Sequence, residues 1–170
     1  MTRYTTLLEE MLEAWAYTRA GVIAEARNLP ASGWDVRPAS GARTPGQIVW
    51  HIIESGLLMA GELSRPDGDF TRKPYPRLIR EYTRTIRRRA SRSDLLRLLD
   101  TTHEQGARQI RRAGELHMLQ LITRFDGQPG TRLAWMHHGV SHEEYHRGQL
   151  ALEARLSGRV PALTKRILGA

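Results

Sequence analysis

The spacing of apolar residues near the N-terminus is the feature that most limits what this chain can fold into. From Thr2 to about Asn28, apolar residues recur at steps of three and four along the sequence. The members of this series are Tyr4, Leu8, Met11, Leu12, Trp15, Val22, Ile23 and Ala26. Such spacing places them on one face of a helix, with polar residues on the other. Pro30 follows the expected end of this amphipathic helix.

A second helix is predicted from Pro45 to Leu63 because its start carries three separate signals. Thr44 is a favourable N-cap residue, and Pro45 takes the first helical position, where its missing N–H costs nothing. Gln47 completes a Thr-x-x-Gln capping box. The preceding loop, from Leu29 to Thr44, is rich in Pro, Gly and Ser.

Two more long helices are predicted in the second half of the chain. One begins at a Ser93 cap and fades by Gly114, and the other runs from about Thr131 to Leu156, closed by Gly158. Four long helices predict an all-α fold, a four-helix bundle. The Pro- and Gly-rich stretch after the second helix indicates a long crossover connection there, and such a crossover lets a bundle contain a parallel pair of helices.

A short extended segment is the exception to this helical pattern. Leu119, Leu121 and Thr123 alternate with other residues before an Asp126-Gly127 turn. No second convincing strand is expected, so the all-α prediction stands.

Length and composition limit the class of protein further. The chain has 170 residues, of which 40% are hydrophobic and 26% charged, so we expect one globular domain spanning residues 1–170. No apolar run is long enough for a membrane span, and the first fifteen residues contain acids and a Trp where a signal peptide would be apolar, so we expect neither element and a cytoplasmic location. The chain has no cysteine, so disulfides, thiolate metal sites and a cysteine nucleophile are excluded. Any metal must therefore be bound by histidines and carboxylates.

Histidines at successive helical steps mark the last predicted helix as a candidate metal site. His138, His142 and His146 lie four residues apart and share one face, which Gln149 continues. Each buried imidazole needs a polar partner, so packing alone explains this stripe poorly. We expect His142 and His146 to be the ligands, with His138 and the adjacent His137 in supporting or surface positions.

The third ligand must come from another helix. His51 is the best candidate because it falls on the apolar face of the second helix, among Ile48, Ile52 and Met59. A lone histidine on such a face is more often a hydrogen-bonded core residue, and that interpretation applies to His103 and His117.

The letters His142-Glu143-x-x-His146 also match the helix of zinc proteases, in which Glu143 would be the general base. The third protease ligand is missing. The extended motif needs a histidine at position 152, which is Leu, and no acid follows Glu153. The protease interpretation is therefore the weaker one.

Two segments resemble the DinB/YfiT-like family of metalloenzymes. They are GWDVRPASGARTPGQIVWHIIES, which contains His51, and HHGVSHEEYHRGQLALEARLSGRVP, which contains the family's His-x-x-x-His-Arg-Gly-Gln motif as residues 142–149. The resemblance covers most of the chain, from the first helix to Pro161. It implies a four-helix bundle with a long crossover, often a homodimer, and a divalent metal, usually zinc or nickel. The ligands that it implies are His51, His142 and His146.

The resemblance also implies a class of reaction. Family members with assigned activities include S-transferases or isomerases that use low-molecular-weight thiols. Three neutral histidines leave the ion with its full charge and an open position, which is typical of a catalytic site. We therefore expect the ion to activate a thiol cofactor or water, as a transferase or a hydrolase, against a small electrophilic substrate. Gln149 would orient the bound water or substrate.

Metal-binding histidines usually donate their second N–H to a carboxylate or carbonyl. The sequence leaves four such partners open, namely Glu10, Glu13, Glu54 and Glu143.

Two other classes of function remain open. The formal net charge of +8 comes almost entirely from arginine and would suit a nucleic-acid partner. The candidate residues for that role are Arg84, Arg87, Arg88, Arg89 and Arg92. No aromatic residues interleave with them to stack on bases, so a solvated face is the better interpretation. In the third class the metal is structural and the protein is a non-enzymatic dimer.

Overall fold

A computed structural model describes residues 5–86 and 91–169. Each of its four long helices begins at a hydroxyl side chain that accepts a hydrogen bond from a backbone N–H of the helix's first turn. The helices are α1 (Leu7–Asn28), α2 (Pro45–Leu63), α4 (Arg92–Ala113) and α6 (Arg132–Leu156), and their caps are Thr6, Thr44, Ser91 and Thr131. The predicted capping box of Thr44 and Gln47 is present, with both of its hydrogen bonds.

The predicted Ser93 cap of the third long helix is wrong by two residues. Ser91 accepts from the N–H of Asp94, and the Asp94 side chain accepts from the N–H of Ser91. An acid three residues after a serine forms this reciprocal cap as glutamate does. Ser93 instead lies inside the first turn of α4.

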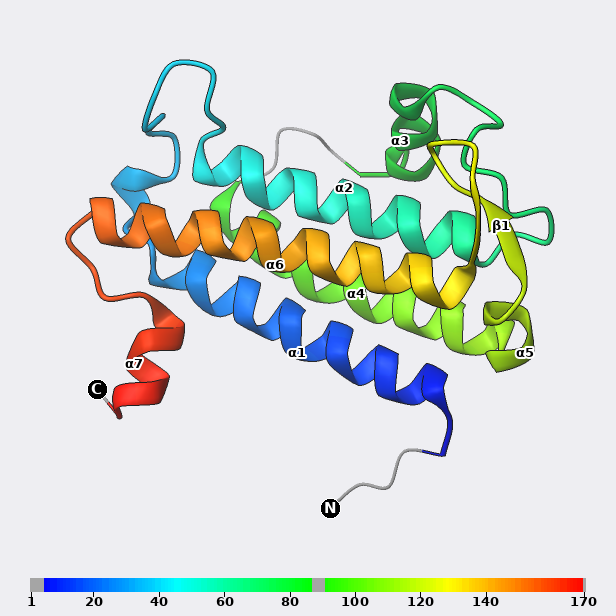
Figure 1. Ribbon diagram of the computed structural model, residues 1–170. Coiled ribbons are helices and arrows are strands. Elements are labelled where there is room, and N and C mark those ends of the chain that lie inside the picture. Colours follow the sequence, from blue (N-terminus) through cyan, green and yellow to red (C-terminus); the bar gives the residue numbers. More distant parts are fainter. Residues whose placement is uncertain (1–4, 87–90, 170) are drawn as a thin grey trace.

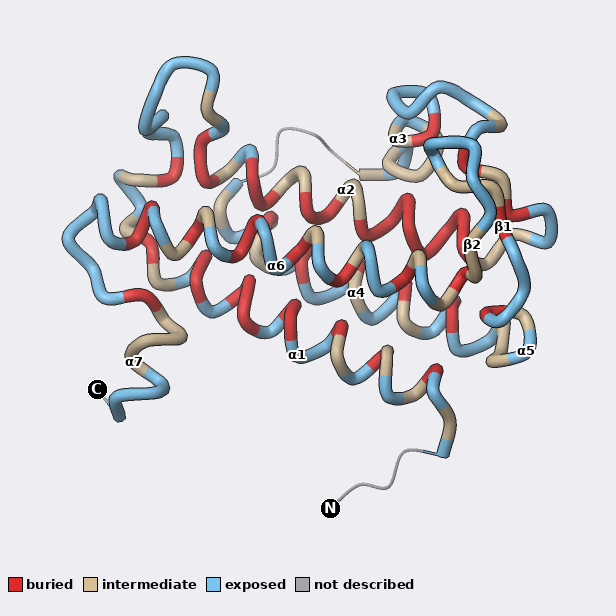
Figure 2. Tube along the Cα trace, viewed as in Figure 1, coloured by how far each residue is buried: buried red, intermediate tan, exposed pale blue. Residues whose placement is uncertain are grey.

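The four helices form the predicted bundle, and α2 and α4 run in the same direction, as do α1 and α6 (Figure 1). The most extensive contacts are those of α2 with α4 and of α1 with α6. Buried residues follow the inner faces of all four helices, and exposed residues follow the outer faces (Figure 2). The long crossover predicted after the second helix is what makes α2 and α4 parallel neighbours.

The crossover between α2 and α4 contains a short helix, α3 (Tyr75–Thr83), which the sequence pattern did not predict. Buried Glu62 at the end of α2 anchors it. The Glu62 carboxylate accepts a hydrogen bond of 2.6 Å from the Tyr82 hydroxyl and forms an ion pair with Arg72, which also pairs with Glu81. Burial next to the Glu62 carboxylate raises the pKa of Tyr82. The charged network thus holds the crossover against α2.

A two-stranded sheet leads into α6. The extended segment predicted near Leu121 is confirmed as β1 (Leu121–Thr123), and it pairs antiparallel with β2 (Pro129–Thr131). The expectation of no second strand is therefore wrong. Gly127 provides the positive φ of 76° that the connecting turn needs. The strand β2 was missed because its three residues, Pro-Gly-Thr, have no strand-forming pattern.

Three other short elements complete the described chain. They are η1 (Ala31–Gly33), α5 (Glu115–Met118) and α7 (Ala162–Leu168). The carboxylate of buried Glu25 on α1 accepts hydrogen bonds of 2.8 and 3.0 Å from the N–H groups of Ala162 and Leu163, which fixes α7 to α1. Among the described residues, no helix has both the length and the apolar composition needed to cross a membrane.

The apolar core consists of two clusters of buried side chains. One surrounds Trp15 and Leu58, and the other surrounds Val22, Ile52 and Leu99. The polar residues described next lie on the side of this core where α2 faces α6.

Candidate metal centre

Three histidines from two helices converge at the interface of α2 and α6. The Nε2 atom of His142 lies 3.1 Å from Nε2 of His51 and 3.1 Å from Nε2 of His146. One nitrogen from each ring lies within 4.8 Å of the others. The structure thus brings together the three residues expected as ligands, and among the described residues no other group of histidines and acids is so arranged.

Two of the three rings have a defined proton position because of the groups beside them. Nδ1 of His51 lies 3.2 Å from a carboxylate oxygen of Glu54, and Nδ1 of His146 lies 2.7 Å from the amide oxygen of Gln149. Both oxygens are hydrogen-bond acceptors, so each Nδ1 carries the proton and each Nε2 presents a lone pair. These lone pairs point toward His142 Nε2. A proton on His142 Nε2 can form a good hydrogen bond with only one of the two lone pairs at a time. A metal ion, in contrast, can bind all three Nε2 atoms at once.

The spacing of the nitrogens fits a divalent metal ion. Zinc binds histidine nitrogen at about 2.0–2.1 Å, and two ligands in a tetrahedral arrangement then lie about 3.3 Å apart. The two observed separations of 3.1 Å need only a small adjustment to reach this value. The donor set is chemically suitable as well, since imidazole binds zinc, nickel, copper and iron.

The protonation state of the cluster also favours cation binding. Burial, together with the neighbouring His146 and His51, lowers the pKa of His142 to about 3. Burial lowers the pKa of His146 as well, against the opposing effect of its hydrogen bond to Gln149. Arg43, in the loop before α2, adds positive charge that disfavours protonation of both rings. At neutral pH these nitrogens are therefore unprotonated and available to a metal.

Glu143 does not belong to this site. Its side chain is 1% exposed and is turned toward α1, where its carboxylate accepts hydrogen bonds from Arg19 at 2.5 and 2.8 Å and from Trp15 Nε1 at 2.7 Å. A carboxylate held by three donors in the core cannot serve as the general base of a metalloprotease. The structure therefore argues against the protease interpretation of His142-Glu143-x-x-His146.

The side chain of Arg147, which also belongs to the motif, packs between α6 and α1 rather than against the histidine cluster. Its guanidinium covers Gly21 of α1, where a Cβ atom would come within 2.4 Å of it, and it pairs with Glu144. The close approach of α1 and α6 thus explains why a residue without a side chain stands at position 21.

The remaining histidines lie outside the cluster. His137 is exposed, and His138 is exposed and stacks on Trp135 with ring centroids 4.3 Å apart. His117 has the expected hydrogen bond, from Nε2 to the carbonyl oxygen of Leu63 at 2.9 Å. His103 packs against Trp15, but its buried Nε2 has no hydrogen-bond partner among the described residues, contrary to expectation.

Glu54 and Gln149 are the supporting residues of the site. Glu54 was one of four open candidates, and only the structure selects it, because Glu10 and Glu13 lie on the exposed side of α1 and Glu143 is bonded to Arg19. Gln149 was expected to orient water or substrate, which stays a prediction. Its observed contact is with the His146 ring. The i,i+3 spacing of both pairs on their helices was the available sequence signal.

Two cavities adjoin the histidine cluster. One of about 870 Å³ is lined by His51 and Glu54 together with polar residues of the loop before α2, including Arg37 and Arg43. The other, of about 160 Å³, is lined by His142 and aromatic side chains. A small molecule can thus reach the cluster from either side.

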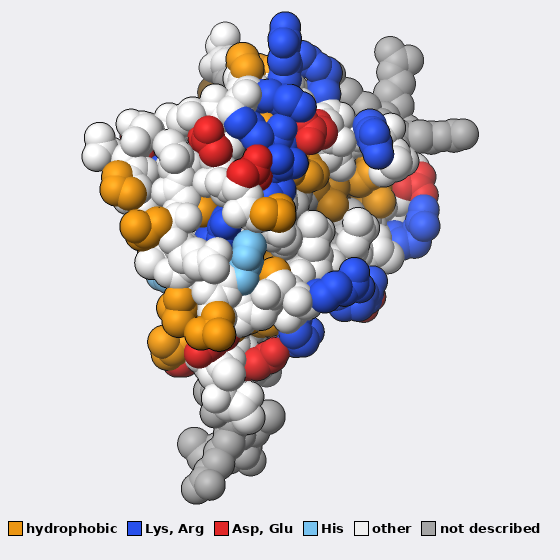
Figure 3. All heavy atoms as spheres, turned by 90° about the vertical axis from the view of Figure 1, so that its right-hand side faces the viewer, with side chains coloured by type: hydrophobic (Ala, Val, Ile, Leu, Met, Phe, Trp, Pro, Cys, Tyr) orange, Lys and Arg blue, Asp and Glu red, His pale blue; other side chains and the backbone are white. Residues whose placement is uncertain are grey.

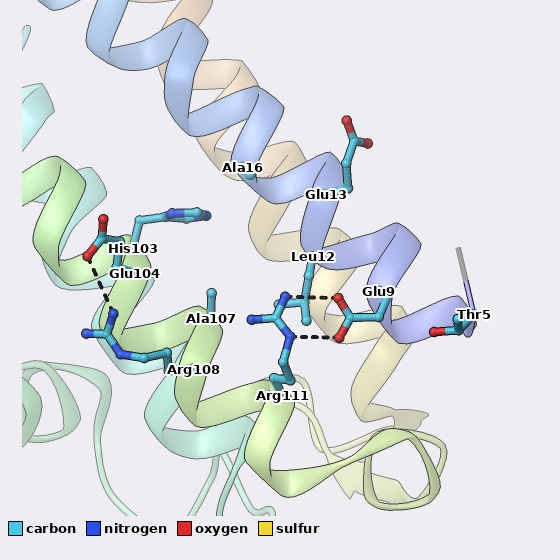
Figure 4. Close-up of a pocket in the computed structure, with 10 residues that line it drawn as sticks. All are labelled: Thr5, Glu9, Leu12, Glu13, Ala16, His103, Glu104, Ala107, Arg108 and Arg111. Atoms are coloured by element: carbon cyan, nitrogen blue, oxygen red, sulfur yellow. Dashed lines mark hydrogen bonds and ion pairs between the residues drawn. The ribbon is translucent and has the colours of Figure 1, made fainter. Parts of the chain in front are cut away.

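A further cleft, of about 660 Å³, lies between α1 and α4 (Figure 4). Its charged side chains pair with one another, Arg111 with Glu9 and Arg108 with Glu104. It contains His103 but none of the three clustered histidines. We therefore do not assign it to the metal site.

The arginines proposed for nucleic-acid binding form no common surface among the described residues. Arg84 is exposed, whereas Arg92 donates to the carbonyl oxygens of Arg27 and Leu29 and lies over the ring of Trp34. Arg87, Arg88 and Arg89 lie outside the described residues. On the end of the bundle that contains α3 and the sheet, basic and acidic side chains lie next to one another (Figure 3).

Comparison with known proteins identifies relatives of this fold. Residues 14–150 match the family model of the DinB superfamily. A DinB-like protein of Bacillus subtilis, YjoA, is 19% identical, with a TM-score of 0.67 over 89% of this chain and 93% of its own. YfiT of the same organism, described as a probable metal-dependent hydrolase with an unusual four-helix bundle topology, is 15% identical, with a TM-score of 0.69 over 94% of each chain. No curated protein sequence matches the chain.

Proposed function

This chain belongs to the DinB superfamily, and on that premise we propose that it is a metal-dependent hydrolase of a small-molecule substrate. The proposed ligands are His51, His142 and His146, and the proposed ion is zinc or nickel. The observation that carries the proposal is the convergence of the three Nε2 atoms, two of them with lone pairs fixed by Glu54 and Gln149. The description of YfiT as a hydrolase supports the choice of reaction class.

The donor set favours a catalytic site over a purely structural one. Three protein ligands leave a tetrahedral ion one position for water or substrate, whereas structural zinc sites are closed by four. An ion in this site would act as a Lewis acid and would lower the pKa of a bound water to about 7. The cavities beside His51 and His142 give a substrate access to that position.

The residues around the ligands have positioning roles in this proposal. Glu54 holds the His51 ring and Gln149 holds the His146 ring, so that each Nε2 keeps its lone pair toward the centre. The negative charge of Glu54 also raises the basicity of the His51 ring, so that its Nε2 would bind a metal ion more strongly. Arg43 lies near enough to oppose protonation of His142 and His146, which would keep both rings ready to bind the ion.

A second reaction that the same site could support is transfer of a group from the substrate to a low-molecular-weight thiol in place of water. A site that lowers the pKa of water would equally favour the thiolate form of a bound thiol. Adding a low-molecular-weight thiol to the metal-loaded protein and its substrate tests this alternative, and transfer to the thiol without hydrolysis would select it. A homodimer and a cytoplasmic location stay predictions.

The proposal predicts hydrolysis that depends on the metal. Protein stripped by a chelator should be inactive toward a panel of small carboxylic esters and amides, and zinc or nickel should restore turnover of at least one of them. His142→Ala should remain inactive after metal addition, while His137→Ala, a change at an exposed neighbouring histidine, should be as active as the wild type. Turnover by stripped protein, or by His142→Ala, equal to that of the metal-loaded wild type would contradict the proposal.

The two positioning residues give a separate prediction about affinity. Glu54→Ala and Gln149→Ala should each weaken binding of zinc about 10–100-fold without abolishing it, because the ligands remain but their rings are free to turn. Competition with a chromophoric chelator measures this affinity. Glu144→Ala, on the exposed side of α6, is the matched control. Unchanged affinity in both variants would show that the two contacts do not support the site.

A further inference from the structure

The smaller cavity beside the histidine cluster is walled by aromatic rings from four separate parts of the chain. Phe70 comes from the crossover, Tyr75 from the start of α3, Phe125 from the turn between the strands, and Trp135 from α6. The other lining residues are Ser55, Leu58, Met59, His138, Gly139 and His142. His142 is thus shared between this cavity and the proposed metal site.

The aromatic rings contact one another edge to face around the cavity. The ring centroid of Phe70 lies 4.8 Å from that of Phe125 and 5.9 Å from that of Trp135, and the centroids of Tyr75 and Phe125 lie 5.7 Å apart. His138 extends the wall by stacking on Trp135 at an interplanar angle of 9°. Such edge-to-face and stacked arrangements are those that a further aromatic ring can join.

The cavity opens to solvent on the side of two of these rings. Phe70, in its interior, is 1% exposed, whereas Tyr75 and Phe125 are 40% and 42% exposed. A ligand with an aromatic ring would cover part of the apolar surface that these two side chains expose at the opening. The buried hydroxyl of Ser55, close to the hydroxyl of Tyr75, adds a polar group to the lining of the cavity.

The volume of the cavity matches that of one six-membered aromatic ring. Its volume is about 160 Å³. An apolar cavity of about 150 Å³ engineered into the core of another protein binds benzene, so one six-membered ring fills a space of this size. A fused two-ring system could not be enclosed in it.

We propose that this cavity binds one aromatic ring of the substrate and so presents the ring's substituent to the histidine cluster. The proposal rests on the proposed function and adds the substrate class, a small molecule with a single aromatic ring. Its geometric basis is that His142 lines the cavity and also contributes its Nε2 to the cluster. A substituent one or two bonds from the ring would then reach the reacting position.

Paired hydroxamates test this assignment on the zinc-loaded protein, because they share one metal-binding group and differ in the ring. Benzohydroxamate should bind at least about tenfold more tightly than acetohydroxamate, as expected for burial of a phenyl group. The fused-ring 2-naphthohydroxamate should lose most of that advantage. Titration calorimetry measures all three affinities. Equal affinity of benzohydroxamate and acetohydroxamate would overturn the proposal.

Variants of the cavity lining test whether the preference for benzohydroxamate over acetohydroxamate arises in this cavity. Ser55→Leu fills the space and should abolish the preference for benzohydroxamate while leaving the affinity for acetohydroxamate unchanged. Phe125→Ala, at the exposed opening, should reduce the preference with little effect on folding. Ser141→Leu, the same change on the exposed face of α6, should have no effect. A preference that persists in both Ser55→Leu and Phe125→Ala would place the ring elsewhere and overturn the proposal.

A metal-independent measurement separates this inference from the proposed function. Benzyl alcohol should bind to the metal-free wild type and not to Ser55→Leu, as followed by saturation-transfer NMR. Binding of benzyl alcohol by a protein that hydrolyses nothing would leave the ring site intact and reject the proposed reaction. Absence of benzyl alcohol binding in a protein that binds zinc and hydrolyses esters would reject the ring site alone.

Discussion

Glu143→Gln should lower the free energy of unfolding by about 3–5 kcal/mol. The change removes the charge that compensates buried Arg19, whose side chain is 2% exposed. It also replaces one of the two oxygens that accept hydrogen bonds from Arg19 and Trp15. An uncompensated guanidinium in the core is costly because the protein interior solvates charge poorly. Urea unfolding, analysed at a common slope, measures the change.

Two further variants show whether the loss comes from the buried pair. Glu144→Gln, at the adjacent acid, should change stability by less than about 1 kcal/mol, because the Glu144 side chain is 43% exposed and solvent screens its interaction with Arg147. The double variant Arg19→Met with Glu143→Leu should recover much of the loss, since apolar side chains of similar volume can replace a buried pair. If Glu143→Gln does not fold, a folded double variant would still show that the unpaired charge of Arg19 causes the loss of stability.

The same variant separates a structural glutamate from a catalytic one. In a metalloprotease helix of this spacing, the glutamate is the general base, and its replacement would abolish activity without lowering stability. In this protein, Glu143→Gln should instead lose stability while the folded fraction still binds metal. A variant as stable as the wild type but inactive would restore the protease interpretation.

Helix positions and the three candidate ligands were predictable from the sequence because they depend on local spacing. The cap at Thr44 with Gln47 is a contact within one helical turn, and the i,i+4 pair of His142 and His146 must share a face of any helix. The error at Ser93 is of the same local kind, because the alternative cap at Ser91 lies only two residues away.

The supporting contacts of the site could be predicted less well, because they depend on how helices pack. Glu54, Glu10, Glu13 and Glu143 were equivalent as partners in the sequence. Packing of α1 against α6 brings Arg19 and Trp15 to Glu143 and removes it from the site. The carboxylate of Glu54 thereby becomes the observed partner of the clustered rings.

The aromatic cavity gave no signal in the sequence at all. Phe70, Tyr75, Phe125 and Trp135 are spread over 66 positions, in a crossover, a short helix, a turn and a long helix. No local pattern relates such positions to one another. Their juxtaposition depends on the path of the crossover, which the buried Glu62 network fixes against α2.

Loss of the metal in ligand variants is the second large effect expected. His51→Ala, His142→Ala and His146→Ala should each reduce bound zinc or nickel to the background of the buffer, because two imidazoles seldom hold such an ion. Because the clustered nitrogens are not needed for the apolar core, the far-ultraviolet circular dichroism of the metal-free variants should match that of the metal-free wild type. Collapse of the fold in all three would instead favour a structural role for the cluster.

The decisive measurement is the metal content of the untagged wild type, determined by plasma mass spectrometry beside His51→Ala, His142→Ala and His137→Ala. We expect about one divalent ion per chain in the wild type and in His137→Ala, whose exposed ring lies outside the cluster, and none in the other two. A wild type that binds no zinc, nickel, manganese or iron after reconstitution would contradict this expectation, as would an ion retained in full by His51→Ala.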